Sequence, residues 1–197
     1  YGRYIVGEDA WGPRALITFT GATALSIPLW AFLGKREEKV ALLRAGHLTL
    51  IAGLGSFLLL PNSALLLPVV ALVGVGAGGV NVMTMALLPD VVEAGQASSG
   101  RRVEAPVFGA FTFALKLGNG LGSGLLGLML GFVGFVQASA VQMPEALVGI
   151  ERIMTLLPIA GSSVVFLLLR GWDLTHEKHR QLQSNEFAMS ATKTPPP

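Results

Sequence analysis

Residues 87–124 read LLPDVVEAGQASSGRRVEAPVFGAFTFALKLGNGLGSG, a charged stretch set between two apolar segments. The stretch predicts the end of one transmembrane helix, a charged turn from Pro89 to Glu104, and a second helix that contains Lys116. A charged side chain inside a membrane-spanning helix is costly, so such residues usually face a cavity or a partner. Lys116 is therefore the first candidate for a functional residue.

The composition of the chain is that of a membrane protein. Of its 197 residues, 52% are hydrophobic and only 13% are charged, whereas soluble domains carry about 25% charged residues. The 25 glycines agree with this class, because glycine lets membrane helices pack closely. The net charge of +2 is too small to indicate a nucleic-acid partner. The chain contains no cysteine, so disulfides and thiolate sites are excluded.

Hydropathy predicts five crossings, since about 20 apolar residues span the hydrocarbon core of a bilayer. The predicted crossings are residues 15–33, 41–60, 65–88, 106–133 and 150–169. A polar loop over 7–14 precedes the first crossing, and a mild loop over 135–149 precedes the last. Residues 1–170 are thus expected to form an all-α membrane bundle, with 171–197 as a largely disordered cytoplasmic tail.

Lysine and arginine counts predict the orientation, because these residues are enriched on the cytoplasmic side. The 34–39 turn, the 101–102 turn and the tail carry most of them, whereas the opposite side has Arg3, Arg14 and Arg152. The C-terminus is therefore expected in the cytoplasm and the N-terminus outside. That orientation, together with a start at Tyr1 and no signal pattern, indicates a piece of a longer protein.

Lys116 lies ten residues beyond Pro106, about 15 Å along a helix and near the middle of the bilayer. Asn119, Gly120 and Ser123 follow at spacings that share its helix face. These residues predict the wall of a cavity. A structural ion pair or a lysine that reaches the membrane surface is the less favoured alternative.

Two further sets of residues are predicted to line the cavity or to pack helices together. Asn81 and Thr84 place a carboxamide and a hydroxyl on one face of the third crossing, where they line the cavity or merely link helices. Glycines spaced four apart predict close packing on the fourth crossing, at Gly118/Gly122, Gly120/Gly124 and Gly127/Gly131.

The charged turn predicts a cytoplasmic gate formed by five residues: Asp90, Glu93, Arg101, Arg102 and Glu104. Acids and arginines would exchange partners as two halves of a transporter rock. The alternative is a solvated turn whose ion pairs are worth about 0–1 kcal/mol each. We place Asp90 at the helix end and regard it as the best gate candidate. Gly34-Lys35-Arg36 forms the corresponding turn between the first two crossings. Its charge is explained by topology, and a conformational role is the less favoured alternative.

No enzyme site is evident. His47, His176 and His179 do not form a metal or catalytic set, and His47 is expected at the membrane interface. The chain has no nucleophile elbow, phosphate-binding loop or carboxylate pair at hydrolase spacing.

Several motifs in this order resemble a known family: SIPLWAFLGKR, LLPDVVEAG, SGRRVEA and FALKLGNGLG. They resemble the glycoside-pentoside-hexuronide:cation symporters, the melibiose-permease-like branch of the major facilitator superfamily. Asp90, Glu93, Arg101, Arg102 and Glu104 stand where the family has acids and basic residues, and Lys116 matches a lysine of its eleventh helix. The segment from PEALVGIERIMTLLPIAG to RGWDLTHEKH resembles the last helix, so the resemblance covers about helices eight to twelve. Ala94-Gly95 replaces an aromatic residue common in the family.

The resemblance implies most of one six-helix half of a transporter that moves a sugar-like solute together with a cation, in the plasma or inner membrane. The coupling cation, sodium or proton, would be bound mainly by an N-terminal half that this chain lacks, and no other cofactor is expected. The implied partners are the lipid bilayer, the solute and that missing half. Lysolipid symporters, which also have a proline-aspartate pair like Pro89-Asp90, remain an alternative. A non-transporting membrane scaffold that pairs Lys116 within the protein is another.

Overall fold

The computed structural model describes residues 5–60, 65–136, 139 and 141–171, and these residues form five long helices and no strand. The helices are α1 (Trp11–Leu33), α2 (Lys39–Leu59), α3 (Leu66–Ser99), α4 (Glu104–Phe132) and α5 (Pro144–Leu169). All five are long and apolar enough to cross a membrane. The predicted all-α membrane bundle is confirmed. The predicted tail lies outside the described residues, except for Gly171.

Helices α1, α2 and α3 form the tightly packed part of the molecule, and glycines on α3 bring their backbones together. A Cβ atom added at Gly74 would lie 2.6 Å from the carbonyl oxygen of Phe19 on α1. One added at Gly76 would lie 2.8 Å from the backbone nitrogen of Leu50 on α2. The four glycines of α3 between 74 and 79 therefore permit contacts that a larger residue would prevent.

The core of this unit lies near the end of the bundle that carries the α1–α2 turn. Trp30, Leu42, Leu43 and Met83 are buried together there. The indole nitrogen of Trp30 donates a hydrogen bond of 2.9 Å to the carbonyl of Val75, so its polar group is satisfied inside the packed region.

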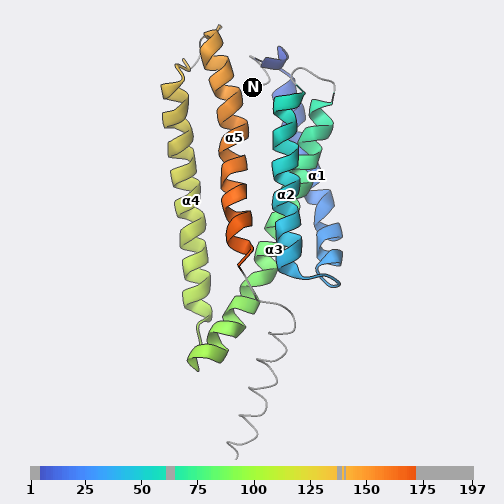
Figure 1. The fold of residues 1–197 in the computed structure, drawn as a ribbon, viewed down its shortest axis with the longest axis vertical. Coiled ribbons are helices and arrows are strands. Elements are labelled where there is room, and N and C mark those ends of the chain that lie inside the picture. Colours follow the sequence, from blue (N-terminus) through green and yellow to red (C-terminus); the bar gives the residue numbers. More distant parts are fainter. Residues whose placement is uncertain (1–4, 61–64, 137–138, 140, 172–197) are drawn as a thin grey trace, which may run out of the picture.

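Helix α5 packs against α2, and α4 lies outside α5, away from α1 (Figure 1). No residue of α4 is buried within the described chain. The predicted glycine packing of α4 is therefore not present here: Cβ atoms added at six of its glycines would meet nothing within 4 Å (Gly118, Gly120, Gly122, Gly124, Gly127 and Gly131).

Two predicted boundaries were wrong. Helix α3 continues through Pro89 to Ser99, so the predicted turn from Pro89 to Glu104 shrinks to the residues between α3 and α4. Helix α5 begins at Pro144, so residues 144–149 of the predicted 135–149 loop are helical. Proline at a first helical position needs no N–H partner, which favours this start. The other ends agree within a few residues, and the 7–14 loop loses its last turn to α1.

Candidate functional site

An ion pair joins the start of α2 to the second half of α3. Lys39 Nζ lies 2.7 Å from Asp90 Oδ2 and 2.8 Å from Oδ1, and it also donates to the carbonyl of Ala86 at 3.1 Å. The two side chains are only 24% and 20% exposed. Salt screens a partly buried ion pair less than an exposed one. The contact therefore holds two helices together at the end that carries both charged turns.

Pro89 precedes Asp90 inside α3, which continues to Ser99. A proline within a helix lacks the N–H that would bond to residue 85 and crowds the preceding turn. The next carbonyl along the helix, that of Ala86, accepts a hydrogen bond from Lys39 Nζ. Asp90 thus sits within α3, which corrects the prediction that it ends the helix.

The turn between α3 and α4 is built around Gly100, whose φ of +64° is left-handed. Such a glycine commonly ends a helix because it has no Cβ to clash. Gly100 N–H closes the last turn on the carbonyl of Gln96 at 2.9 Å. The α1–α2 and α3–α4 turns lie at the same end of the bundle, as the charge counts predict (Figure 1).

The remaining gate candidates lie on the surface of this turn. Arg102 and Glu104 approach to 3.9 Å, with side chains 91% and 60% exposed. Arg101 and Glu93 are also exposed. The structure therefore brings Asp90 together with Lys39 rather than with either arginine. Lys39 was assigned to topology from the sequence, and its spacing of 51 residues from Asp90 gave no local signal.

The predicted cavity residues of α4 share one face but have no protein opposite them. Lys116, Asn119 and Ser123 are all exposed. Ser123 donates back to the carbonyl of Asn119 at 2.9 Å. Lys116 makes no hydrogen bond or ion pair with any described residue. Its role in a cavity stays a prediction, and the partner that the scaffold alternative requires is not found among the described residues.

Asn81 and Thr84 lie on α3, and nothing in the described chain connects them to Lys116. Asn81 is exposed. Thr84 is partly buried and donates to the carbonyl of Val80 in its own helix at 2.7 Å. The polar groups of α3 and α4 thus do not meet within this chain.

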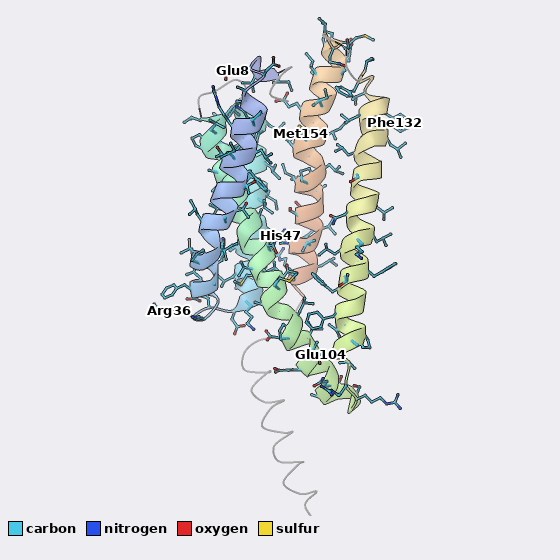
Figure 2. The ribbon with its side chains drawn as sticks, turned by 180° about the vertical axis from the view of Figure 1, so that it is seen from behind. Glu8, Arg36, His47, Glu104, Phe132 and Met154 are labelled. Carbon is cyan, nitrogen blue, oxygen red and sulfur yellow. The ribbon has the colours of Figure 1, made fainter. Side chains whose placement is uncertain are left out.

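Sequence reasoning missed the settings of two basic residues of α2, one buried and one partly buried. His47 is 7% exposed, and its Nδ1 atom is buried without a partner. This burial corrects the expectation of an interfacial histidine (Figure 2). Arg44, one turn earlier, donates from Nη2 to the carbonyl of Leu169 at the end of α5, while its Nε is buried without a partner. A cation near a helix C-terminus satisfies carbonyls that the helix leaves free.

Within the described residues, no three His, Cys, Asp or Glu side chains lie close enough to hold a metal ion. His176 and His179 fall outside those residues.

Comparisons with known proteins agree with these features. Residues 1–176 match the family described as MFS/sugar transport protein. An uncharacterized symporter of Bacillus subtilis is 31% identical over 74% of this chain and 32% of its own length. A glucuronide carrier protein homolog of Escherichia coli is 30% identical over 57% of this chain and 24% of its own length.

A more distant similarity extends further along the chain. The sodium-dependent lysophosphatidylcholine symporter 1 of Gallus gallus is 22% identical over 90% of this chain and 34% of its own length. The chain thus spans about a third or less of each of these relatives. All three are named as symporters or carriers.

Proposed function

The chain belongs to the MFS/sugar transport protein family, the melibiose-permease-like branch of the major facilitator superfamily, and we propose that it is the C-terminal part of a cation-coupled symporter for a glycoside-like solute. The match over residues 1–176, joined to five membrane-spanning helices, is the observation that carries this proposal. The relatives named symporter and glucuronide carrier homolog support the class of solute.

The solute site lies between this chain and an N-terminal half of the transporter. Lys116, Asn119 and Ser123 of α4 contribute to it, together with Asn81 and Thr84 of α3. The exposure of Lys116 and its lack of a partner in the described chain support this placement. A lysine at lipid depth needs a counter-charge or a water-filled cavity, and an opposing half supplies either. Alternating access then follows from rocking of the two halves around this site.

The charged end of α2 and α3 acts as the cytoplasmic gate. Asp90 is its central residue, and Lys39 holds it in the conformation described here. Glu93, Arg101, Arg102 and Glu104 are available as alternative partners when the halves move. An exchange of partners costs little if each charge is paired in both conformations, because no charge is left buried alone.

The C-terminus is proposed to lie in the cytoplasm, which the lysine and arginine excess at this end supports. The proposed location is the plasma or inner membrane. The coupling cation is sodium or a proton, and carboxylates of the N-terminal half hold it. No other cofactor is proposed.

Lysolipid transport is the second candidate, and the similarity to the chicken lysophosphatidylcholine symporter over 90% of the chain favours it. The two candidates differ in the site they need. A glycoside needs a compact polar pocket that includes Lys116, whereas a lysolipid also needs a wide apolar cleft open to the bilayer.

Uptake by the full-length transporter that contains this chain distinguishes these functions. Proteoliposomes are offered labelled glucosides, glucuronides and lysophosphatidylcholine, with and without sodium or proton gradients. We expect gradient-dependent uptake of a glycoside. Uptake of lysophosphatidylcholine and of no glycoside would support lysolipid transport. Uptake of none of these solutes would support a non-transporting membrane scaffold.

A further inference from the structure

The C-terminal end of α5 is joined through one residue to the packed helices α1, α2 and α3, which we call the α1–α3 unit. Leu169, the last residue of α5, packs with its side chain against the buried cluster of that unit (Trp30, Leu42, Leu43 and Met83). Its backbone carbonyl accepts a hydrogen bond from Arg44 Nη2 on α2. The side chain and the backbone of Leu169 are therefore both anchored to the α1–α3 unit.

Arg44 supplies a charge that the last turn of α5 lacks. That turn contains no basic residue, and Arg170 directly after it is exposed. The last four carbonyls of a helix have no partner within it, and the helix dipole leaves partial negative charge there. A guanidinium group from a neighbouring helix satisfies one of these carbonyls and opposes this charge. Arg44 is thus a cap on α5 that comes from α2.

Arg44 lies on a different side of α2 from Lys39. The two residues are five positions apart, which is about 140° around a helix axis. Lys39 contacts Asp90 on α3, whereas Arg44 contacts the end of α5. Figure 1 shows that α5 ends at the end of the bundle that carries the α1–α2 turn. Helix α2 therefore holds two neighbouring helices at one end of the bundle, each with a different basic residue.

At the opposite end of the bundle, α4 and α5 are joined firmly to each other. Gln142 is 7% exposed; its Nε2 donates to the carbonyl of Val136 at 2.7 Å, and its Oε1 accepts from the N–H of the same residue at 3.1 Å. A Cβ atom added at Gly149 of α5 would lie 2.5 Å from that of Val133, which follows α4. We call α4, α5 and their loop the α4–α5 hairpin. Because this end is fixed, the hairpin that carries Lys116 can move as one body.

The donors of Arg44 are only partly used in this conformation. A guanidinium group carries five N–H donors. Arg44 Nε is buried and has no hydrogen-bond acceptor among the described residues, and a buried donor without an acceptor costs free energy. This cost offsets part of the hydrogen bond to Leu169, so that opening the contact costs less than breaking a fully satisfied one. The contact is thus suited to open and close during a transport cycle.

We propose that Arg44 is a positioning residue for transport. It latches the C-terminal end of α5 to the α1–α3 unit in the conformation described here, and its release lets the α4–α5 hairpin move and carry Lys116 with it. Arg44 does not belong to the proposed solute site, so it acts on the rate of the conformational change and not on solute affinity. The inference rests on the proposed transport function, but the latch itself is measured without a solute.

The experiment measures distances between spin labels by pulsed EPR, in the full-length transporter in nanodiscs, after any native cysteine has been replaced. The α1–α5 pair of labels stands at Leu29 and Val164, whose side chains are 54% and 56% exposed. The hairpin pair stands at Leu128 and Leu156, which are 64% and 48% exposed. Arg44→Met is compared with the unmodified protein, because methionine keeps an unbranched side chain but has no donor for a carbonyl.

The latch predicts a change in one of the two distances only. Arg44→Met should broaden the distance distribution of the α1–α5 pair and add a longer component, while the hairpin pair keeps its distribution. Arg44→Lys should keep the unmodified distribution of both pairs, because an ammonium group can donate the single hydrogen bond that the carbonyl of Leu169 accepts.

Uptake by proteoliposomes separates a positioning role from a purely structural one. Arg44→Met should lower the maximal uptake rate by about tenfold with little change in KM, because a conformational step and not solute binding is affected. Arg14→Gln is the matched control, since Arg14 forms an exposed ion pair with Glu8 on the surface. This control should change neither the distances nor the uptake rate.

The proposal is wrong if the α1–α5 distribution is unchanged in Arg44→Met, because other contacts would then hold α5. It is also wrong if the hairpin pair separates as well, or if Arg44→Lys behaves like Arg44→Met, since packing would then hold α5 in place of the hydrogen bond. A changed distribution with a normal uptake rate would make Arg44 purely structural. Absence of uptake by the unmodified protein would remove the proposed function, and the distances would still decide on the latch. If Arg44→Met does not fold, Arg44→Gln replaces it with the same expected results.

Discussion

Lys39 on α2 and Asp90 on α3 form a partly buried ion pair of 2.7 Å across 51 residues of sequence. The same ammonium group donates a hydrogen bond to the carbonyl of Ala86. Ala86 follows Met85, whose carbonyl receives no helical hydrogen bond because Pro89 has no N–H. A proline, an acid and a distant lysine thus act together at one end of the bundle. This relationship provides the most specific test of the proposed gate.

Removing one charge of this pair should impair both stability and transport. We expect Asp90→Asn to lower the free energy of unfolding by about 1–3 kcal/mol, between the values for exposed and buried pairs. Transport should fall in Asp90→Asn and in Lys39→Gln, and the exchange Lys39→Asp with Asp90→Lys should restore part of it. Thermal unfolding in detergent and solute uptake are the two measurements.

The matched control for the ion pair is Arg14→Gln, because Arg14 lies outside the proposed gate and forms an exposed pair with Glu8 at 3.1 Å, with side chains 60% and 56% exposed. Its effect on stability should be about 0–1 kcal/mol. If Arg14→Gln and Asp90→Asn have the same effect on uptake, the Lys39–Asp90 contact has no special role in gating.

The end of α3 shows what hydropathy can and cannot predict. At 1.5 Å per residue the 34 residues of α3 extend about 51 Å, which exceeds a hydrocarbon core of about 30 Å. Hydropathy places the membrane boundary near Leu88, and that boundary stays a prediction. The helix continues beyond this boundary to Ser99, because its backbone hydrogen bonds do not depend on lipid. The charged stretch was therefore mistaken for a turn.

The pairing of distant residues was the other part that sequence could not supply. Asp90 and Lys116 were recognised by their unusual setting, since charges in apolar segments are conspicuous. Lys39 and Arg44 were not, because their partners lie on other helices and no periodicity connects them. His47 was wrongly assigned to the interface, since position along a helix does not reveal which face is covered.

Glycine positions on α3 should tolerate substitution far less than those on α4. Gly74→Ala places a methyl group 2.6 Å from the backbone oxygen of Phe19, where only a shift of α1 can relieve the clash. We expect a loss of about 1–3 kcal/mol in stability. Gly118→Ala meets open space and should be neutral or stabilising by up to about 1 kcal/mol. Unfolding midpoints of the two variants compared side by side provide the check.

Lys116→Ala should abolish gradient-driven uptake without destabilising this chain. Lys116 has no partner among the described residues, so its removal breaks no contact here. Leu128→Ala serves as the control, because Leu128 lies on the same helix and is 64% exposed. Normal uptake by Lys116→Ala, with protein levels equal to those of the control, would remove the lysine from the proposed solute site.

Residues 1–197 alone should not transport. The proposed site needs an opposing half, and polar groups left unmatched at lipid depth cost several kcal/mol each in the limiting case. We expect the isolated chain to self-associate or to be unstable, and to show no accumulation of solute after reconstitution. Uptake that Lys116→Ala abolishes would instead mean that two copies build a complete transporter.

The accumulation ratio of a labelled glycoside in proteoliposomes tests the proposed symport most directly. The full-length transporter is given phenyl glucuronide, and the internal and external concentrations are compared while a sodium or proton gradient is imposed and then collapsed with an ionophore. Cation-coupled symport predicts an internal concentration above the external one, which returns to equality when the gradient is collapsed. Equal concentrations with and without the gradient, or uptake of lysophosphatidylcholine in place of every glycoside offered, would contradict it.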